Sequence, residues 1–181
     1  CVYPEGGFEF NLCGDSIAAE IIFNSEIELW QVPSDVYFQM KVSFFELMDK
    51  VYPCGIIGRY LTERTYTCAG DMMKRLVQIK DTPFALSRFG RQSACAAATR
   101  MGGELWSLSD SVCVGLMINS TLGRYEMRFP PSDVLPDGKY VFERQDGLRQ
   151  IRVYNSIDNG FILRDFFEKL KFYYGENDGR T

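Results

Sequence analysis

The chain has 181 residues, of which 46% are hydrophobic and 14% aromatic; this suffices for one ordinary domain with a buried core and excludes a disordered protein. A net charge of −4 and a sequence pI of about 5.0 oppose binding to a phosphate backbone, so an RNA-binding role would need a local basic patch. No apolar run approaches the roughly 18 to 20 residues that span a bilayer, which predicts a soluble protein without a membrane span.

The first part of the chain is predicted to be mainly helical. Asp15 can cap a short helix over residues 15–23. Apolar and polar residues alternate over 36–43, which indicates a strand. Further helices are predicted over 71–79 and 93–100. Shared faces are formed by Ile17, Ile21 and Ile22 on the first helix and by Met72, Leu76 and Ile79 on the helix over 71–79.

The rest of the chain is predicted to form strands separated by turn sequences such as PPSDVLPDG, RQDG and SIDNG. Helices followed by a run of antiparallel strands indicate an α+β fold rather than alternating βαβ units. The expected strands cover residues 112–119, 124–129, 139–143, 149–155 and 160–165.

We therefore predict a twisted antiparallel sheet built mainly from residues 112–165, with the helix over 71–79 packed on one face. Residues 1–65 are assigned to an N-terminal α+β segment and 66–181 to the main domain, together forming one compact unit. Glu-Leu-Trp occurs twice, ending at Trp30 and at Trp106, so the first segment is interpreted as a possible degenerate repeat. The expected core comprises Met72, Leu76, Ile79, Val112, Val114, Ile151 and Val153.

The chain has six cysteines, an even number without CxxC spacing, and no histidine. Such a set is typical of a disulfide framework in a secreted protein, although reduced, buried thiols in an intracellular protein are the alternative. Without histidine the usual zinc sites are not expected, and neither a metal nor a cofactor is predicted. The candidate disulfide residues are Cys1, Cys13, Cys54, Cys68, Cys95 and Cys113.

The segment RYEMRFPPSDVLPDGKY, residues 124–140, carries a Tyr-Glu pair on an expected strand that ends in two prolines. The order of strands and turns around it, preceded by a helix and by Tyr66-Thr67-Cys68, resembles the small fungal guanyl-specific ribonucleases. It is still more similar to the catalytically dead, ribonuclease-like secreted effectors of powdery mildew fungi, over residues of about 66–170. The resemblance implies a ribonuclease-like, disulfide-stabilised fold.

In the active ribonucleases a glutamate after tyrosine is the general base and a later histidine is the acid. The resemblance places Glu126 at the base position and Arg164 at the acid position. Because arginine stays protonated at any relevant pH, it cannot donate the proton, so the protein is predicted not to be an enzyme. We expect Arg164 or a neighbouring arginine to form a salt bridge with Glu126 across the sheet; the alternative is a solvated strand glutamate paired with Arg124 or Arg128.

The leading hypothesis is a secreted, non-catalytic effector with a signal peptide and a role in virulence, which engages a host protein or, less readily, RNA. One alternative is a bacterial lipoprotein or cell-surface domain anchored at Cys1. Another is an intracellular enzyme or scaffold with free thiols. The aromatic residues of the C-terminal tail, Phe172, Tyr173 and Tyr174, are expected either to cover a sheet edge or to contact a partner. The candidate binding residues are Tyr125, Arg128, Arg152, Phe172, Tyr173 and Tyr174.

Overall fold

The computed structural model describes residues 2–7, 10–79, 105–143 and 149–175; for Phe10 and residues 68–79 it describes the backbone alone. The chain divides into two compact units that interleave along the sequence. The first unit comprises residues 1–38 and 113–158, and the second comprises residues 39–112 and 159–181. The predicted boundary after residue 65 and the internal repeat stay predictions.

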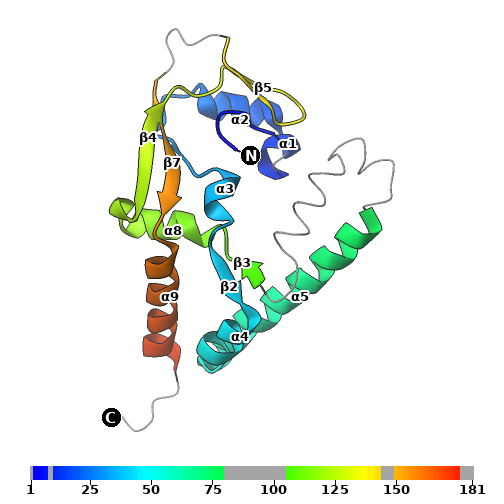
Figure 1. Ribbon diagram of the computed structural model, residues 1–181, viewed down its shortest axis with the longest axis vertical. Helices are drawn as coiled ribbons and strands as arrows, with labels where there is room; N and C mark the ends of the chain where they lie inside the picture. The colour runs from blue at the N-terminus through cyan, green and yellow to red at the C-terminus, as the bar shows by residue number, and fades with distance from the viewer. Residues whose placement is uncertain (1, 8–9, 80–104, 144–148, 176–181) are drawn as a thin grey trace. The chain divides into compact units, whose positions relative to one another are not determined.

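A three-stranded mixed sheet forms the centre of the first unit, in the order β1-β7-β4. Strand β1 is parallel to β7, whereas β4 is antiparallel to β7, and β4 and β7 run side by side in Figure 1. A separate antiparallel pair is formed by β5 and β6. The elements of this unit are α1 (Phe10–Gly14), α2 (Ser16–Phe23), β1 (Trp30–Gln31), α3 (Ser34–Tyr37), η2 (Ser120–Leu122), β4 (Gly123–Arg128), β5 (Asp133–Val134), β6 (Tyr140–Val141) and β7 (Ile151–Ile157).

Alternation along β7 sorts the side chains of the sheet onto two faces. Arg152 and Tyr154 lie on one face, and Tyr154 is directly opposite Tyr125 of β4. Val153 lies on the other face, opposite Glu126. The second face covers the core of the first unit, whose buried residues are Phe23, Val134, Tyr140, Ile151 and Val153.

The second unit joins a short antiparallel pair, β2 and β3, to helices. Its buried cluster consists of apolar side chains from β2, from the segment that follows it and from α9. Burying these apolar surfaces is the main force that holds the unit together. The elements are β2 (Lys41–Ser43), α4 (Phe44–Glu46), the π-helical η1 (Leu47–Val51), α5 (Gly55–Ile79), β3 (Leu105–Ser107) and α9 (Asn159–Tyr174); the core is Val42, Leu47, Val51, Cys54, Phe167 and Leu170.

Helix α8 (Ser111–Ile118) links the two units along the chain, and it corrects one prediction. A strand was expected over 112–119, but this apolar run has no clear period, and such a run is compatible with either a strand or a buried helix. A strand was also expected over 160–165, but these residues belong to α9. There, partly buried Leu163 and Phe166 and buried Phe167 and Leu170 recur at spacings of three and four residues, which is a helical pattern. The expected strand over 160–165 was too short to show it.

Other local predictions were confirmed in part. Helix α2 forms where expected, and the Asp15 carboxylate accepts a hydrogen bond of 2.9 Å from the backbone N–H of Ala18. The strand expected over 36–43 is wrong over its first residues, where α3 forms, and right over β2. Strands β4, β6 and β7 overlap those expected, and the helix predicted over 71–79 is the end of α5. The helix expected over 93–100 lies outside the described residues.

The predicted fold class is wrong. The parallel pairing of β1 with β7 makes the sheet mixed, so the antiparallel, ribonuclease-like α+β arrangement is replaced by an α/β fold. No disulfide joins Cys13, Cys54 and Cys113, while Cys1, Cys95 and the side chain of Cys68 lie outside the described residues. Val112, Ile151 and Val153 are buried as expected, Val114 is exposed, and the side chains of Met72, Leu76 and Ile79 are not described.

Candidate functional site

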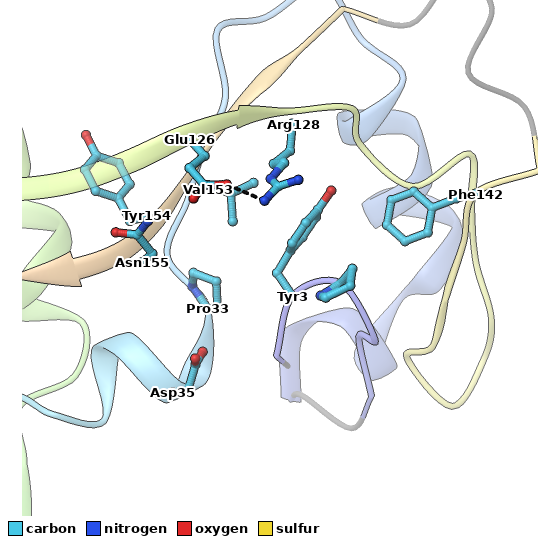
Figure 2. A pocket seen from close by; sticks show the side chains of 10 residues that line it. Tyr3, Pro33, Asp35, Glu126, Arg128, Phe142, Val153, Tyr154 and Asn155 are labelled. Atoms are coloured by element: carbon cyan, nitrogen blue, oxygen red, sulfur yellow. Dashed lines mark hydrogen bonds and ion pairs between the residues drawn. The ribbon is translucent and has the colours of Figure 1, made fainter.

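A cavity of about 350 Å³ opens on the second face of the first unit's sheet (Figure 2). Its floor includes Val153 and Asn155 of β7, and β4 adds Glu126 and Arg128. The remaining lining residues come from the N-terminal segment, from the segment around α3, from β7 and from the end of β6: Tyr3, Pro4, Pro33, Asp35, Tyr154 and Phe142.

Glu126 and Arg128 form an ion pair within this cavity, drawn as a dashed line in Figure 2. They are two residues apart on a strand, so both side chains leave the same face of the sheet. Each side chain is 53% exposed, and a pair this open to water contributes about 0–1 kcal/mol. Its importance is therefore chemical rather than structural: it places an anion and a cation side by side at the opening.

Aromatic rings form another wall of the cavity. The Tyr3 hydroxyl donates a hydrogen bond of 3.0 Å to the backbone carbonyl of Phe129, and its ring lies edge-on to that of Phe142, with centroids 5.9 Å apart. Burial raises the pKa of Tyr3, and the positive charge of Arg128 opposes this only in part. The phenol is thus neutral and held in one orientation.

The first face of the sheet carries a cation between two aromatic rings. The Arg152 guanidinium lies 4.6 Å from the ring centroid of Trp30 and 5.0 Å from that of Tyr125. The Glu28 carboxylate accepts a 2.8 Å hydrogen bond from the Trp30 indole and forms a 3.1 Å ion pair with Arg152. The predicted binding residues Tyr125 and Arg152 are thus brought together, while Glu28 and Trp30 were missed because β1 is too short to show a period.

Tyr154 lies next to this cluster, with ring centroids 5.9 Å from Trp30 and 5.5 Å from Tyr125. Its side chain is fully buried, and its hydroxyl has no hydrogen-bond partner among the described residues. Burial raises the pKa of this phenol, and Arg152 offsets that shift only in part. A neutral hydroxyl is therefore buried inside the unit, and Arg152 compensates only in part for its burial.

Arg164 and the aromatic residues of the tail belong to the second unit, whereas Glu126 belongs to the first. Arg164 lies in α9 of the second unit rather than on a strand, and its guanidinium is 6.0 Å from the Phe161 ring centroid. The alternative pairing of Glu126 with Arg128 is the one observed. Phe172, Tyr173 and Tyr174 are exposed at the end of α9, and their binding role stays a prediction.

Metal binding and membrane insertion were checked over the described ranges. No group of three or more His, Cys, Asp or Glu side chains converges there as a set of metal ligands. Within the same ranges, none of the helices is long and apolar enough to cross a bilayer.

No family model matches the chain, and no curated protein matches it. Solved structures do. The purine-preferring ribonucleoside hydrolase from Gardnerella vaginalis superposes with a TM-score of 0.61 at 18% identity, over 92% of this chain and 46% of that one. The plant nucleoside hydrolase PpNRh1 gives a TM-score of 0.61 at 18% identity, over 91% of this chain and 48% of that one. The fold resembles part of a nucleoside hydrolase. The chain spans about half the length of these proteins.

This similarity corrects the resemblance drawn from the sequence. The match to nucleoside hydrolases covers 92% of the chain. In this chain β1 and β7 pair in parallel, whereas the expected ribonuclease-like sheet is antiparallel. The interpretation as a ribonuclease-like effector with a disulfide-stabilised fold and a role in virulence is therefore wrong. A host or cell-surface protein as the partner stays a prediction. Secretion and the absence of catalysis stay predictions.

Proposed function

We propose that this chain binds ribonucleosides in the cavity that contains Glu126 and Arg128. The observation that carries the proposal is the combination of an aromatic wall with a charged, hydrogen-bonding floor in one cavity of a nucleoside hydrolase-like fold. Its volume of about 350 Å³ falls within the roughly 300–1,000 Å³ of typical small-molecule sites.

A nucleoside presents a flat base and a sugar with several hydroxyls, and the cavity offers a complement to each. The rings of Tyr3 and Phe142 provide apolar surface for the base, since bases bind well against aromatic side chains. The Glu126 carboxylate accepts hydrogen bonds from sugar hydroxyls, while Arg128 and Asn155 can donate to sugar or base oxygens. Hydrogen bonds to a charged group contribute about 1.5–3 kcal/mol, which favours the sugar over an apolar ligand.

Hydrolysis of the N-glycosidic bond is not part of the proposal for this chain on its own. That reaction needs a proton donor for the departing base and an activated water. The chain contains no histidine, and the Glu126 carboxylate is already engaged by Arg128. We therefore expect binding without turnover, in keeping with the sequence-based prediction about catalysis.

The test is calorimetric titration of the protein with inosine, with uridine, hypoxanthine and D-ribose as comparison ligands. Inosine should bind saturably and more tightly than either hypoxanthine or D-ribose, because only the nucleoside contacts both the aromatic wall and the charged floor of the cavity. Glu126→Gln should weaken inosine binding about tenfold, the loss of roughly 1.4 kcal/mol expected when a charged acceptor becomes neutral.

Glu63→Gln is the matched control, because Glu63 is an exposed carboxylate on α5 in the other unit. It should leave the titration unchanged. Absence of saturable binding, or equal weakening by both substitutions, would contradict the proposal. Release of hypoxanthine from inosine during the titration, followed by chromatography, would contradict the expectation of binding without turnover.

A further inference from the structure

Strand β4 is an edge of the three-stranded sheet, and its outer side is open. The strand order β1-β7-β4 gives β4 a neighbour, β7, on one side (Figure 1). Among the described residues, no backbone hydrogen bond reaches β4 from its other side. Every residue of β4 after Gly123 is exposed. An edge of this kind presents N–H and C=O groups with which another strand can pair.

The charged side chains of β4 alternate in sign along one face of the sheet. Arg124, Glu126 and Arg128 are two residues apart, so they lie on the face that carries Val153. Arg128 contacts Oε2 of Glu126, whereas Oε1 accepts no hydrogen bond from the described residues. The Arg124 side chain forms no ion pair within the same ranges. The strand thus offers a cation and a carboxylate oxygen that can each take a further partner.

A second copy of β4 complements both groups. When two such strands pair antiparallel with Tyr125 opposite Tyr125, Arg124 of each copy lies opposite Glu126 of the other. Opposite charges and aromatic rings that lie directly across a strand pair are both stabilising. Residues 123–127 of the two copies then pair with one another, and each copy contributes the same surface around a two-fold axis.

The neighbouring symmetric registers are less favourable. With Glu126 opposite Glu126, Arg124 faces Arg128, and like charges in such positions are destabilising. With Met127 opposite Met127, Arg124 lies opposite Pro130, which has no N–H to donate. Charges on an edge strand normally prevent pairing with other strands. On β4 they oppose the wrong registers and permit the one centred on Tyr125.

We propose that β4 is a self-association surface, through which two copies of this chain pair antiparallel with Tyr125 at the centre. The two three-stranded sheets then form one continuous sheet. Because a single pair of strands buries little surface, the association is weak and depends on protein concentration. The proposal rests on the open edge and its charges, and it is independent of ribonucleoside binding in the cavity.

Sedimentation velocity at micromolar to millimolar protein concentrations tests the pairing. The wild type should change from monomer to dimer as the concentration rises. Arg124→Glu should weaken the dimer about tenfold, because carboxylates then face each other across the strand pair. Adding Glu126→Arg to Arg124→Glu exchanges the two charges and should restore the dimer. Arg64→Glu makes the same charge change at an exposed position of α5 in the other unit, and this matched control should leave the dimer unchanged.

Cysteine cross-linking tests the register. Tyr125→Cys should form a disulfide between the two copies on mild oxidation, because Cα atoms directly opposite in an antiparallel pair are about 4.5–5.5 Å apart. Met127→Cys should not, because Met127 faces Gly123 and lies about 14 Å along the strands from Met127 of the second copy. Peptide mass spectrometry separates these links from those of the native cysteines, and circular dichroism verifies that each variant is folded.

Three results in the sedimentation experiment would overturn the proposal. These are a wild type that stays monomeric at millimolar concentration, a dimer that tolerates Arg124→Glu, and a folded charge-exchanged variant that fails to dimerise. A disulfide through position 127 in place of position 125 would overturn the register centred on Tyr125.

Discussion

The guanidinium of Arg152 is held between two aromatic rings, 4.6 Å from the ring centroid of Trp30 and 5.0 Å from that of Tyr125. The three residues lie on β7, β1 and β4, which are the three strands of the mixed sheet. The Arg152 side chain therefore contacts both neighbours of β7, the parallel strand β1 and the antiparallel strand β4. A planar guanidinium suits this position better than an ammonium, because it stacks on rings while it pairs with Glu28.

Arg152→Lys should lower the free energy of unfolding by about 1 kcal/mol, the typical value of a partly desolvated cation–π contact. Urea denaturation followed by Trp fluorescence measures it, and Trp30 reports on the cluster directly. Arg64→Lys, at an exposed position of α5, is the control and should cause no change. Equal stability of both variants would show that the stacking contributes nothing.

Gly123 allows β4 to pass close to Tyr154. A Cβ atom at this position would lie 2.6 and 2.7 Å from two Tyr154 ring carbons and 2.9 Å from a Leu116 methyl carbon. Gly123→Ala should therefore destabilise the first unit by about 1–3 kcal/mol through overpacking. Thermal unfolding measures the loss. Gly14→Ala is the matched control, since no heavy atom lies within 4 Å of its Cβ, and a similar loss there would refute the packing explanation.

The buried Tyr154 hydroxyl is predicted to cost stability. Tyr154→Phe removes a buried hydroxyl that has no hydrogen-bond partner within the described part of the chain, so the free energy of unfolding should rise by about 1 kcal/mol at neutral pH. Burial raises the pKa of Tyr154 in the folded protein, so the unfolded chain loses its proton first as the pH rises. The wild type should thus lose stability above the unfolded value of about 10, and Tyr154→Phe should lose less.

Urea titrations at pH 8 and above, with exposed Tyr60→Phe as the control, measure this difference. If Tyr154→Phe destabilised the protein at neutral pH, the hydroxyl would have to be hydrogen-bonded in solution.

A capping box starts the helical segment of the second unit. The Ser43 hydroxyl accepts a 3.0 Å hydrogen bond from the Glu46 backbone N–H, and the Glu46 carboxylate accepts one of 3.1 Å from the Ser43 N–H. Ser43→Ala should cost about 1 kcal/mol in chemical denaturation. Ser43→Asp, which can still cap, should retain most of the stability; if both variants lost it equally, the hydroxyl would not act as a cap.

The stability that this capping box contributes should depend on pH, because Glu46 is one of its two members. Burial acts to raise the pKa of its carboxyl, but hydrogen bonds from Ser43 and Lys50 outweigh it, so the pKa is lowered. The folded state therefore holds the charged form more strongly than the unfolded chain does. This stabilisation should be present at neutral pH and vanish as the pH falls through the folded value, and Glu46→Gln should reduce that acid-dependent loss.

Residues with a local signal were predicted correctly from the sequence. Asp15 caps α2 as its position suggested, and the turn sequences on either side of residues 124–129 predicted β4. The errors occurred where local signals are weak. The apolar runs of α8 and the start of α9 were both taken for strands, and this turned a mixed α/β arrangement into an antiparallel one. Strand β1 has only two residues, so its parallel pairing is set by tertiary packing and leaves no pattern to detect.

In the candidate site too, residues close together on one strand were suggested by the sequence, whereas residues from distant segments were not. Glu126 and Arg128 share a face because they alternate on one strand, and the sequence suggested their pairing. Tyr3 and Phe142 reach the cavity from distant segments, through packing of the N-terminal segment against the core that includes Tyr140. Contacts between such distant segments depend on the tertiary fold, and no single sequence reveals them.

Ribonucleoside binding in the Glu126 cavity is tested most directly by nuclear magnetic resonance of ¹⁵N-labelled protein titrated with inosine. The account predicts saturable shifts of the backbone amides of Glu126, Arg128 and Asn155, which line the cavity. The indole N–H of Trp30 lies on the opposite face of the sheet and should stay unmoved. Shifts confined to Trp30, or no saturable shift at all, would contradict the assignment of this cavity as the nucleoside site.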